Sequence, residues 1–305
     1  MKKWIAVILA MMLACTACFA FAETEDSDAI VDRGNEALVA EDYATALEQF
    51  TKVADLGNPR AVNNLGWLYQ KGFGVEQDYE KAIAYYEKAS EMGQNVATAN
   101  LGWLYYNGEG VERDPGKALE YFKAAAEQGN ASTLGQIGSM YANGEGVEQD
   151  YTKALECYTK SAEMGDRSSM HNLGWVYDYG LGVEQDYKKA FEYYSKAAEM
   201  GNPLSFYSLG ILYYEGLGTE KDYGKCFENW MRSAELGHAP AYEAVGELYR
   251  DGLSVEQDYG KAADWFHKAV EMGETDEAQV NYDKLIEEGK IPKDYTPKEI
   301  TFETK

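Results

Sequence analysis

The side chains that most often carry out chemistry in proteins are few in this chain and are not spaced for it. Three histidines, His171, His238 and His267, are scattered, and after residue 22 the chain has no H-E-x-x-H or C-x-x-C motif that could supply metal ligands. Aspartate and glutamate are so abundant that some pairs of carboxylates must occur by chance. We therefore predict no catalytic residue, no metal site and no cofactor, and we expect that the protein is not an enzyme.

Two glycine-containing stretches resemble phosphate-binding loops only in part. Residues 110–117 have a spacer one residue too long for a P-loop, and they lie in a repeat loop rather than after a strand. Gly72 and Gly74 lack the third glycine and the preceding strand of a dinucleotide site. The acidic segment 76–78 recurs, and we attribute it to helix capping by Asp78 rather than to calcium binding.

These stretches recur because the chain is built from a repeat of 36 residues. At this interval Gly66 returns as Gly102, Gly138, Gly174, Gly210 and Gly246. A fixed period of this length, without drift, indicates a protein of stacked structural repeats.

Each repeat predicts two amphipathic helices, here named helix A and helix B. In the first repeat, the apolar face of helix A consists of Ala61, Val62, Leu65, Leu68 and Tyr69. Gly72 is expected to end helix A in a left-handed conformation, and Asp78 to cap the start of helix B. Helix B would bury Ala82, Tyr86 and Ala89. Because one pair cannot cover its own apolar face, neighbouring pairs must stack.

Gly66 lies in the middle of helix A, where glycine costs about 1 kcal/mol relative to alanine. Its return in six repeats suggests one common cause, which is the close approach of a neighbouring helix that leaves no room for a Cβ atom. The small residues at the register of Ala82 in helix B agree with such tight packing.

This repeat resembles the Sel-one-like repeat (SLR) family, a branch of the tetratricopeptide repeat (TPR) superfamily. The shared pattern is Leu-Gly-x-x-Tyr, then Gly-x-Gly-Val-x-x-Asp-x-x-Lys-Ala, then Tyr, Ala and Gly, in six repeats over 61–276. Ser254, Thr219 and Cys226 depart from it locally. The resemblance implies an all-α, right-handed α-solenoid of stacked helix-turn-helix repeats that acts as an adaptor for other proteins.

Some secreted members of that family have a cysteine pair in every repeat and are associated with weak β-lactamase activity. This chain lacks such pairs, so that activity is not carried over. Cys157 and Cys226 lie two repeats apart, too far for the geometry of a disulfide. Cys226 takes an alanine position and is expected to be a small core residue.

The first 22 residues have the pattern of a secretory signal peptide. Two lysines precede an apolar stretch over 4–17, and Ala20-Phe21-Ala22 matches a cleavage site. Residues 1–22 are therefore expected to be removed on export to the periplasm or the medium. Two alternatives stay open, a membrane anchor formed by residues 4–22 and, with poorer spacing at its cysteines, a lipoprotein.

The segments on either side of the six repeats depart from the pattern. Residues 23–28 are predicted to be an acidic leader and residues 29–60 a shorter, TPR-like repeat. Residues 277–288 are predicted to be a capping helix, since terminal repeats are usually atypical. Residues 289–305 are predicted to be a tail, either packed on the last repeat or disordered.

The formal net charge of −24 limits the choice of partner. Nucleic acid and anionic membrane surfaces would be repelled, so we expect neither as a partner of the mature chain. A protein or peptide is expected instead, and the charge favours a basic one. We expect the chain itself to be a monomer.

Large rings recur on the otherwise polar outer face of helix A and need an explanation. The candidate binding face consists of Asn64, Trp67, Asn100, Trp103, Tyr106, His171, Asn172, Trp175 and Tyr214. Either the rings pack between successive repeats, or they line a groove in which asparagine amides bond to a bound peptide.

We therefore favour an exported scaffold that binds proteins or peptides through the helix A face. Two other functions stay open, a secreted hydrolase of the β-lactamase-like type and a purely structural surface protein.

Overall fold

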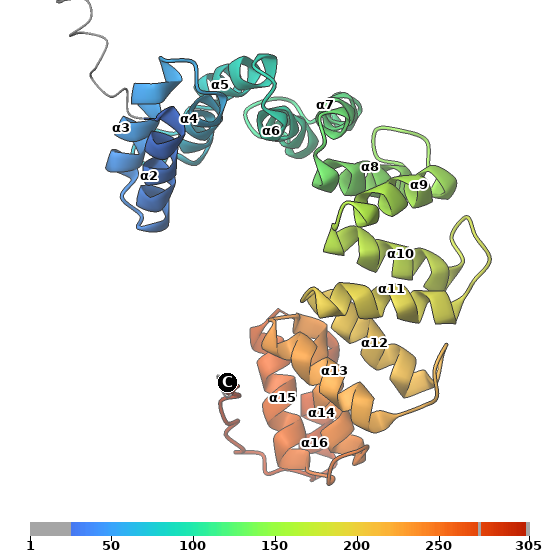
Figure 1. The fold of residues 1–305 in the computed structure, drawn as a ribbon. Coiled ribbons are helices and arrows are strands. Elements are labelled where there is room, and N and C mark those ends of the chain that lie inside the picture. The colour runs from blue at the N-terminus through green and yellow to red at the C-terminus, as the bar shows by residue number, and fades with distance from the viewer. Residues whose placement is uncertain (1–25, 274–275, 303–305) are drawn as a thin grey trace, which may run out of the picture. The chain divides into compact units, whose positions relative to one another are not determined.

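The computed structural model describes residues 26–273 and 276–302, and this part of the chain consists of helices and loops without a strand (Figure 1). The predicted signal peptide, residues 1–22, lies outside the described residues. The all-α prediction is confirmed.

The helices alternate between the two predicted kinds. The A helices are α4 (Pro59–Lys71), α6 (Asn95–Asn107), α8 (Ala131–Asn143), α10 (Arg167–Tyr179), α12 (Pro203–Glu215) and α14 (Ala239–Asp251). The B helices are α5 (Tyr79–Glu91), α7 (Pro115–Glu127), α9 (Tyr151–Glu163), α11 (Tyr187–Glu199), α13 (Tyr223–Glu235) and α15 (Tyr259–Glu271). The flanking helices are α2 (Ser27–Val39), α3 (Tyr43–Ala54) and α16 (Asp276–Glu287).

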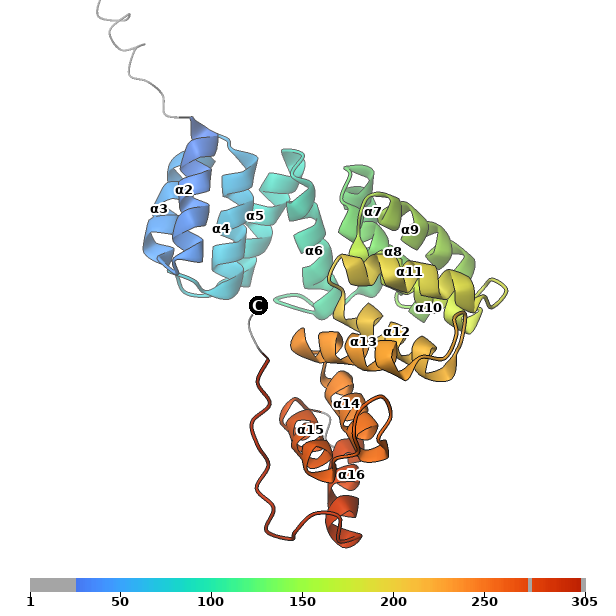
Figure 2. The same ribbon diagram turned by 60° about the horizontal axis from the view of Figure 1, so that its bottom comes forward.

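The chain divides into two compact units at residues 133 and 134, within α8. In unit 1, every helix from α2 to α7 packs on the next one along the chain. In unit 2, the same holds from α9 to α16 (Figure 2). Stacked helix pairs are the packing that a repeat solenoid requires, so the predicted architecture is confirmed.

The predicted helix ends are also found. Gly72 has a φ of 71°, and its N–H donates to the Leu68 carbonyl at 2.9 Å, which closes α4. The Asp78 side chain accepts a hydrogen bond of 3.0 Å from the Lys81 backbone N–H and so caps α5.

Gly66 lies under an aromatic ring of helix B in its own repeat. A Cβ atom built on Gly66 would come within 2.8 Å of the Tyr86 ring. The six rings in this register are Tyr86, Phe122, Tyr158, Tyr194, Trp230 and Phe266. The predicted close approach is confirmed, although a ring makes most of the contact rather than the small residue at the register of Ala82.

Cys226 is buried in α13, at the register that is alanine in the other repeats. Burial also raises the pKa of the Cys226 thiol to about 12. The burial of Cys226 supports the prediction that it is a small core residue.

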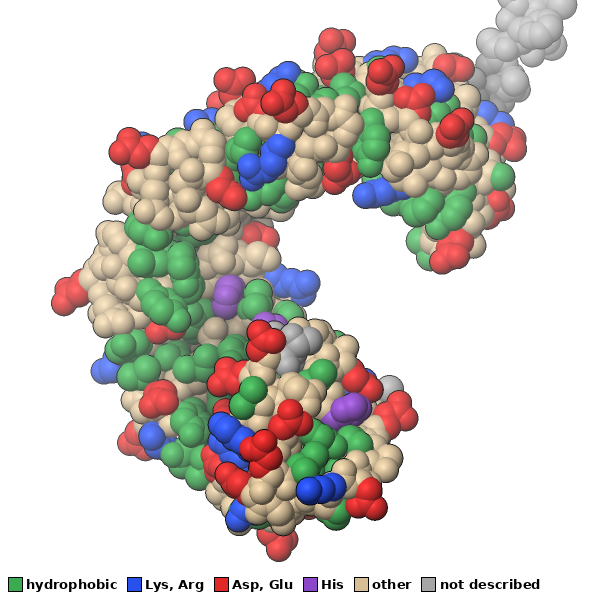
Figure 3. All heavy atoms as spheres, turned by 180° about the vertical axis from the view of Figure 1, so that it is seen from behind, with side chains coloured by type: hydrophobic (Ala, Val, Ile, Leu, Met, Phe, Trp, Pro, Cys, Tyr) green, Lys and Arg blue, Asp and Glu red, His purple; other side chains and the backbone are tan. Residues whose placement is uncertain are grey.

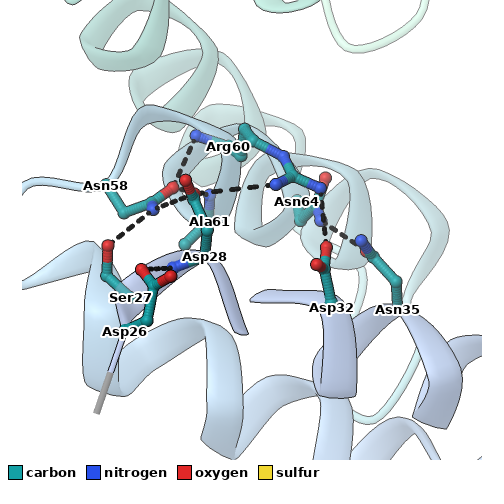
Figure 4. Close-up of polar contacts among 9 residues, drawn as sticks. All are labelled: Asp26, Ser27, Asp28, Asp32, Asn35, Asn58, Arg60, Ala61 and Asn64. Carbon is teal, nitrogen blue, oxygen red and sulfur yellow. Dashed lines mark hydrogen bonds and ion pairs between the residues drawn. The ribbon is translucent and has the colours of Figure 1, made fainter. Parts of the chain in front are cut away.

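Polar contacts join helix α2 of the first helix pair to the start of α4 in the second pair (Figure 4). Asn58, the cap of α4, donates to Ser27 at 3.2 Å and to Asp28 at 3.1 Å. Arg60 bonds to Asp32 at 2.9 Å. Helix α2 begins at Ser27, so it includes the last two residues of the segment predicted to be the leader, 23–28.

The tail packs on the last repeat. Asp264, which is 6% exposed, accepts hydrogen bonds of 2.8 Å from the Tyr295 hydroxyl and from the Lys298 backbone N–H. Phe302 then makes edge contacts with Tyr242 and Trp265. Of the two alternatives for this segment, residues 289–302 adopt the packed one.

Candidate binding face

The nine predicted site residues lie on four A helices. Asn64 and Trp67 belong to α4, and α6 contributes Asn100, Trp103 and Tyr106. These five residues lie in unit 1. His171, Asn172 and Trp175 belong to α10 and Tyr214 to α12, so these four lie in unit 2. The face is therefore described below as two groups.

In unit 1, asparagine side chains form a ladder from helix to helix. Asn100 donates to Asn63 at 3.1 Å, Asn63 donates to Asn64 at 3.1 Å, and Asn64 donates to Asn35 at 3.0 Å. The ladder joins α6, α4 and α2. A carboxamide has two N–H groups and an oxygen with two lone pairs, so the ladder uses only part of its capacity. Sequence reasoning missed Asn63, whose signal was its position beside Asn64.

A second polar link lies about two turns further along α4. The Gln70 side chain accepts from the Tyr86 hydroxyl at 2.7 Å and donates to the Glu109 carboxylate at 2.9 Å. The hydrogen bond from Gln70 holds the pKa of Glu109 below its usual value. Gln70 therefore connects the ring that covers Gly66 to the loop of the next repeat.

The two tryptophans of unit 1 have different surroundings. Trp67 meets the edge of Phe73 at 5.3 Å, and Phe73 stacks at 4.5 Å on Tyr43, the first residue of α3. Trp103 is 37% exposed and makes edge contacts with Tyr106 at 5.6 Å and Phe122 at 5.1 Å. Trp103 thus combines an open ring surface with support from its own repeat.

In unit 2, His171 is a packed residue rather than an open one. Its Nδ1 atom lies 3.0 Å from the Ser205 hydroxyl, and its ring lies 5.2 Å from that of Tyr194. Burial lowers the pKa of His171 to about 4, so the ring is neutral at pH 7.

Trp175 and Tyr214 present rings at half-buried positions of unit 2. Trp175 lies 6.4 Å from Tyr151, the first residue of the preceding helix B, and 6.1 Å from Tyr179, which is 65% exposed. Tyr214 stacks on Trp230 at 5.7 Å. Asn172, three residues before Trp175 on α10, is also half-buried.

Sequence reasoning also missed Asp178, which follows Trp175 on α10. Its carboxylate accepts a hydrogen bond of 3.2 Å from the Tyr194 hydroxyl, and burial raises its pKa. Its signal was its place in the register of Gln70 and Tyr214, one turn after the tryptophan.

The side chains of this face are rings, carboxamides and carboxylates, which offer apolar contact area together with hydrogen-bond donors and acceptors. Among the described residues, no group of three His, Cys, Asp or Glu is arranged to hold a metal ion. In the same part of the chain, every helix is too short or too polar to cross a bilayer. Figure 3 shows acidic side chains scattered over the face in view, with hydrophobic ones gathered between them over unit 2.

Comparison with known proteins gives one consistent result. Six stretches match the Sel1 repeat: residues 59–94, 95–130, 134–166, 167–202, 207–238 and 239–274. A solved Sel1 repeat protein from Oxalobacter formigenes is 33% identical with a TM-score of 0.75, and the match covers 79% of this chain and 99% of that one.

A second similar structure is that of a protective antigen present in uropathogenic Escherichia coli strains, which displays an SLR fold. It is 34% identical with a TM-score of 0.73, over 88% of this chain and 58% of that protein. The present chain therefore spans little more than half of the antigen's length. A comparison with curated proteins finds no match.

Proposed function

The chain belongs to the Sel1 repeat family, and from this premise we propose that it is an exported scaffold whose helix A face binds a protein or peptide. Sel1 repeat proteins are generally scaffolds for protein–protein interactions. The face, the export and the adaptor role are our proposal for this chain.

The observation that carries the proposal is the setting of Trp103. Its ring is 37% exposed, it is held from below by Tyr106 and Phe122, and it belongs to the same helix as the amide of Asn100. Binding energy in protein interfaces concentrates in such rings, where truncation can cost about 2 kcal/mol or more. Because the ring is already held in place, little conformational entropy is lost when a partner covers it.

The test is the substitution Trp103→Ala, with Tyr121→Ala as the matched control. Tyr121 is a half-buried ring on helix B of the same repeat, stacked on Tyr105 at 5.6 Å. The mature chain would be used to recover partners from culture supernatant and envelope, and the affinity of a recovered partner then measured for each variant. We expect Trp103→Ala to weaken binding at least about tenfold, which is about 1.4 kcal/mol, and Tyr121→Ala to leave it unchanged.

Melting temperatures of the same variants separate binding from packing. If the ring serves only to hold repeats together, Trp103→Ala lowers the melting temperature, and folded protein still binds as tightly as before. That outcome would reject the helix A face as the binding surface.

Export rests on residues 1–22, with their lysines, apolar stretch and Ala20-Phe21-Ala22 site. The intact mass of the exported protein should correspond to a chain that starts at Glu23. A mass that includes residues 1–22 would indicate a membrane anchor, and a lipid-modified cysteine would indicate a lipoprotein.

A further inference from the structure

The A helices of unit 2 carry an excess of negative charge. Helices α10, α12 and α14 contain the acidic residues Asp178, Glu215, Glu243, Glu247 and Asp251. Their arginines are Arg167 and Arg250. Arg167 donates to the Met200 carbonyl, and Arg250 forms ion pairs with Glu247 at 3.1 Å and Asp251 at 2.7 Å. His171 adds no positive charge, because burial keeps it neutral at pH 7.

Asp178 is a half-buried acidic residue of α10. Among the described residues, the Tyr194 hydroxyl donates to its carboxylate at 3.2 Å, and no ion pair joins that carboxylate to a lysine or arginine. A partly buried carboxylate is costly unless a cation or several donors satisfy it. Asp178 therefore lacks the counter-ion that such a position favours.

Apolar and aromatic side chains surround this charge on the same helices. Tyr179 is 65% exposed, Ile211 is 37% exposed, and Trp175 lies one turn before Asp178. Tyr214 on α12 also lies in a negative environment. Burial raises its pKa, and Tyr223, Glu247 and Asp251 raise it further. Rings and carboxylates together attract a cationic group, through cation–π contact and charge-assisted hydrogen bonds.

We propose that the outer faces of α10, α12 and α14 dock an extended protein segment that carries a lysine or arginine beside an apolar residue. Asp178 accepts the cationic group, while Trp175 and Ile211 provide the apolar contact. This inference rests on the proposed function of the helix A face and specifies the chemistry of its partner. Charge complementarity selects this occupant, because an acidic segment, a nucleic acid or an anionic bilayer would be repelled.

The probe is a library of short random peptides displayed on phage and selected on the full mature chain. Selected peptides should be enriched in lysine and arginine over the starting library. One selected peptide is then synthesised, and its Kd is measured by calorimetry against each protein variant. A selection without this enrichment, or one that recovers no binding peptide, overturns the proposal.

The decisive variant is Asp178→Asn, with Glu228→Gln as the matched control. The asparagine oxygen can still accept from Tyr194, so the fold is kept while the charge is removed. Glu228 is an exposed acid on helix α13, outside the proposed surface. We expect Asp178→Asn to weaken binding about tenfold at low salt and Glu228→Gln to change it less than about twofold. Equal affinity of Asp178→Asn and the unmodified chain rejects the role of Asp178.

A second comparison separates this inference from the proposed function. A version of the peptide with its basic residues replaced by glutamine, and the protein variant Ile211→Asp, are measured in the same way. If neutral and basic peptides bind alike and Ile211→Asp weakens both, the helix A face binds peptides but does not select basic ones. If neither Ile211→Asp nor Asp178→Asn weakens any selected peptide, the proposed function fails for unit 2 as well.

Discussion

Replacing Gly174 by alanine should destabilise unit 2, although alanine is the better helix former. A Cβ atom at Gly174 would lie 2.5 Å from Cδ1 and 2.6 Å from Cε1 of Tyr194. Carbon atoms in contact prefer about 3.5–4.0 Å, so the ring or the helix must move by about 1 Å.

Tyr194 has little freedom to make that movement. Its side chain is 1% exposed, and its hydroxyl donates to Asp178 at 3.2 Å. Overpacking of this kind costs about 1–3 kcal/mol. The higher helix propensity of alanine offsets about 1 kcal/mol of that cost. We therefore expect a net loss of up to about 2 kcal/mol in the free energy of unfolding.

The matched control is Gly224→Ala in the same unit. Gly224 is an exposed glycine in the first turn of α13, and an added Cβ atom would meet only the Asp222 carboxylate, at 3.2 Å. The free energy of unfolding of this variant should rise by up to about 1 kcal/mol, because alanine is the better helix former.

Urea unfolding followed by far-ultraviolet circular dichroism gives the free energy of both variants. The free energy of unfolding should fall in Gly174→Ala and rise in Gly224→Ala, and the two variants should differ by about 2 kcal/mol. A Gly174→Ala protein that is as stable as the unmodified chain, or more stable, would show that the ring does not prevent a side chain at this register.

Three further predictions concern single residues. Ser254 has a φ of 65° at a loop position that is glycine in the other repeats, so Ser254→Gly should raise the free energy of unfolding by up to about 1 kcal/mol in urea melts. Phe302→Ala should lower it by about 1–2 kcal/mol, because the ring packs on Tyr242 and Trp265, and an unchanged melting curve would mean that the tail adds no stability. His171 has a folded pKa of about 4 against an ordinary 6.5, so the unfolded chain binds a proton first and stability falls as the pH drops from 6.5 towards 4. His171→Gln should show a smaller loss across that window in pH-dependent melts, and an equal loss would contradict the assignment.

The repeat pattern determined most of the local structure. Gly72 adopts the left-handed cap and Asp78 the helix cap that their residue types favour, because both act on backbone within a few residues. The return of glycine at the register of Gly66 in all six repeats likewise indicated a position with no room for a side chain.

The partners of individual side chains were decided only by tertiary structure. A helical wheel places Asn64 and Trp67 on the outer face of helix A, but not the ladder through Asn63 to Asn100 or the contact of Trp67 with Phe73. Those depend on the rotamer of each side chain and on the spacing between helices, which the period leaves open.

The lack of a counter-ion at Asp178 is also a feature that only the tertiary structure decides. The sequence places Asp178 one turn after Trp175, in a register that holds five different residue types across the six repeats. Its half-buried position and its hydrogen bond to Tyr194 follow from how α10, α11 and α12 pack. Local pattern therefore determines where the helices lie along the chain, and packing between residues distant in sequence determines which side chains remain available to a partner.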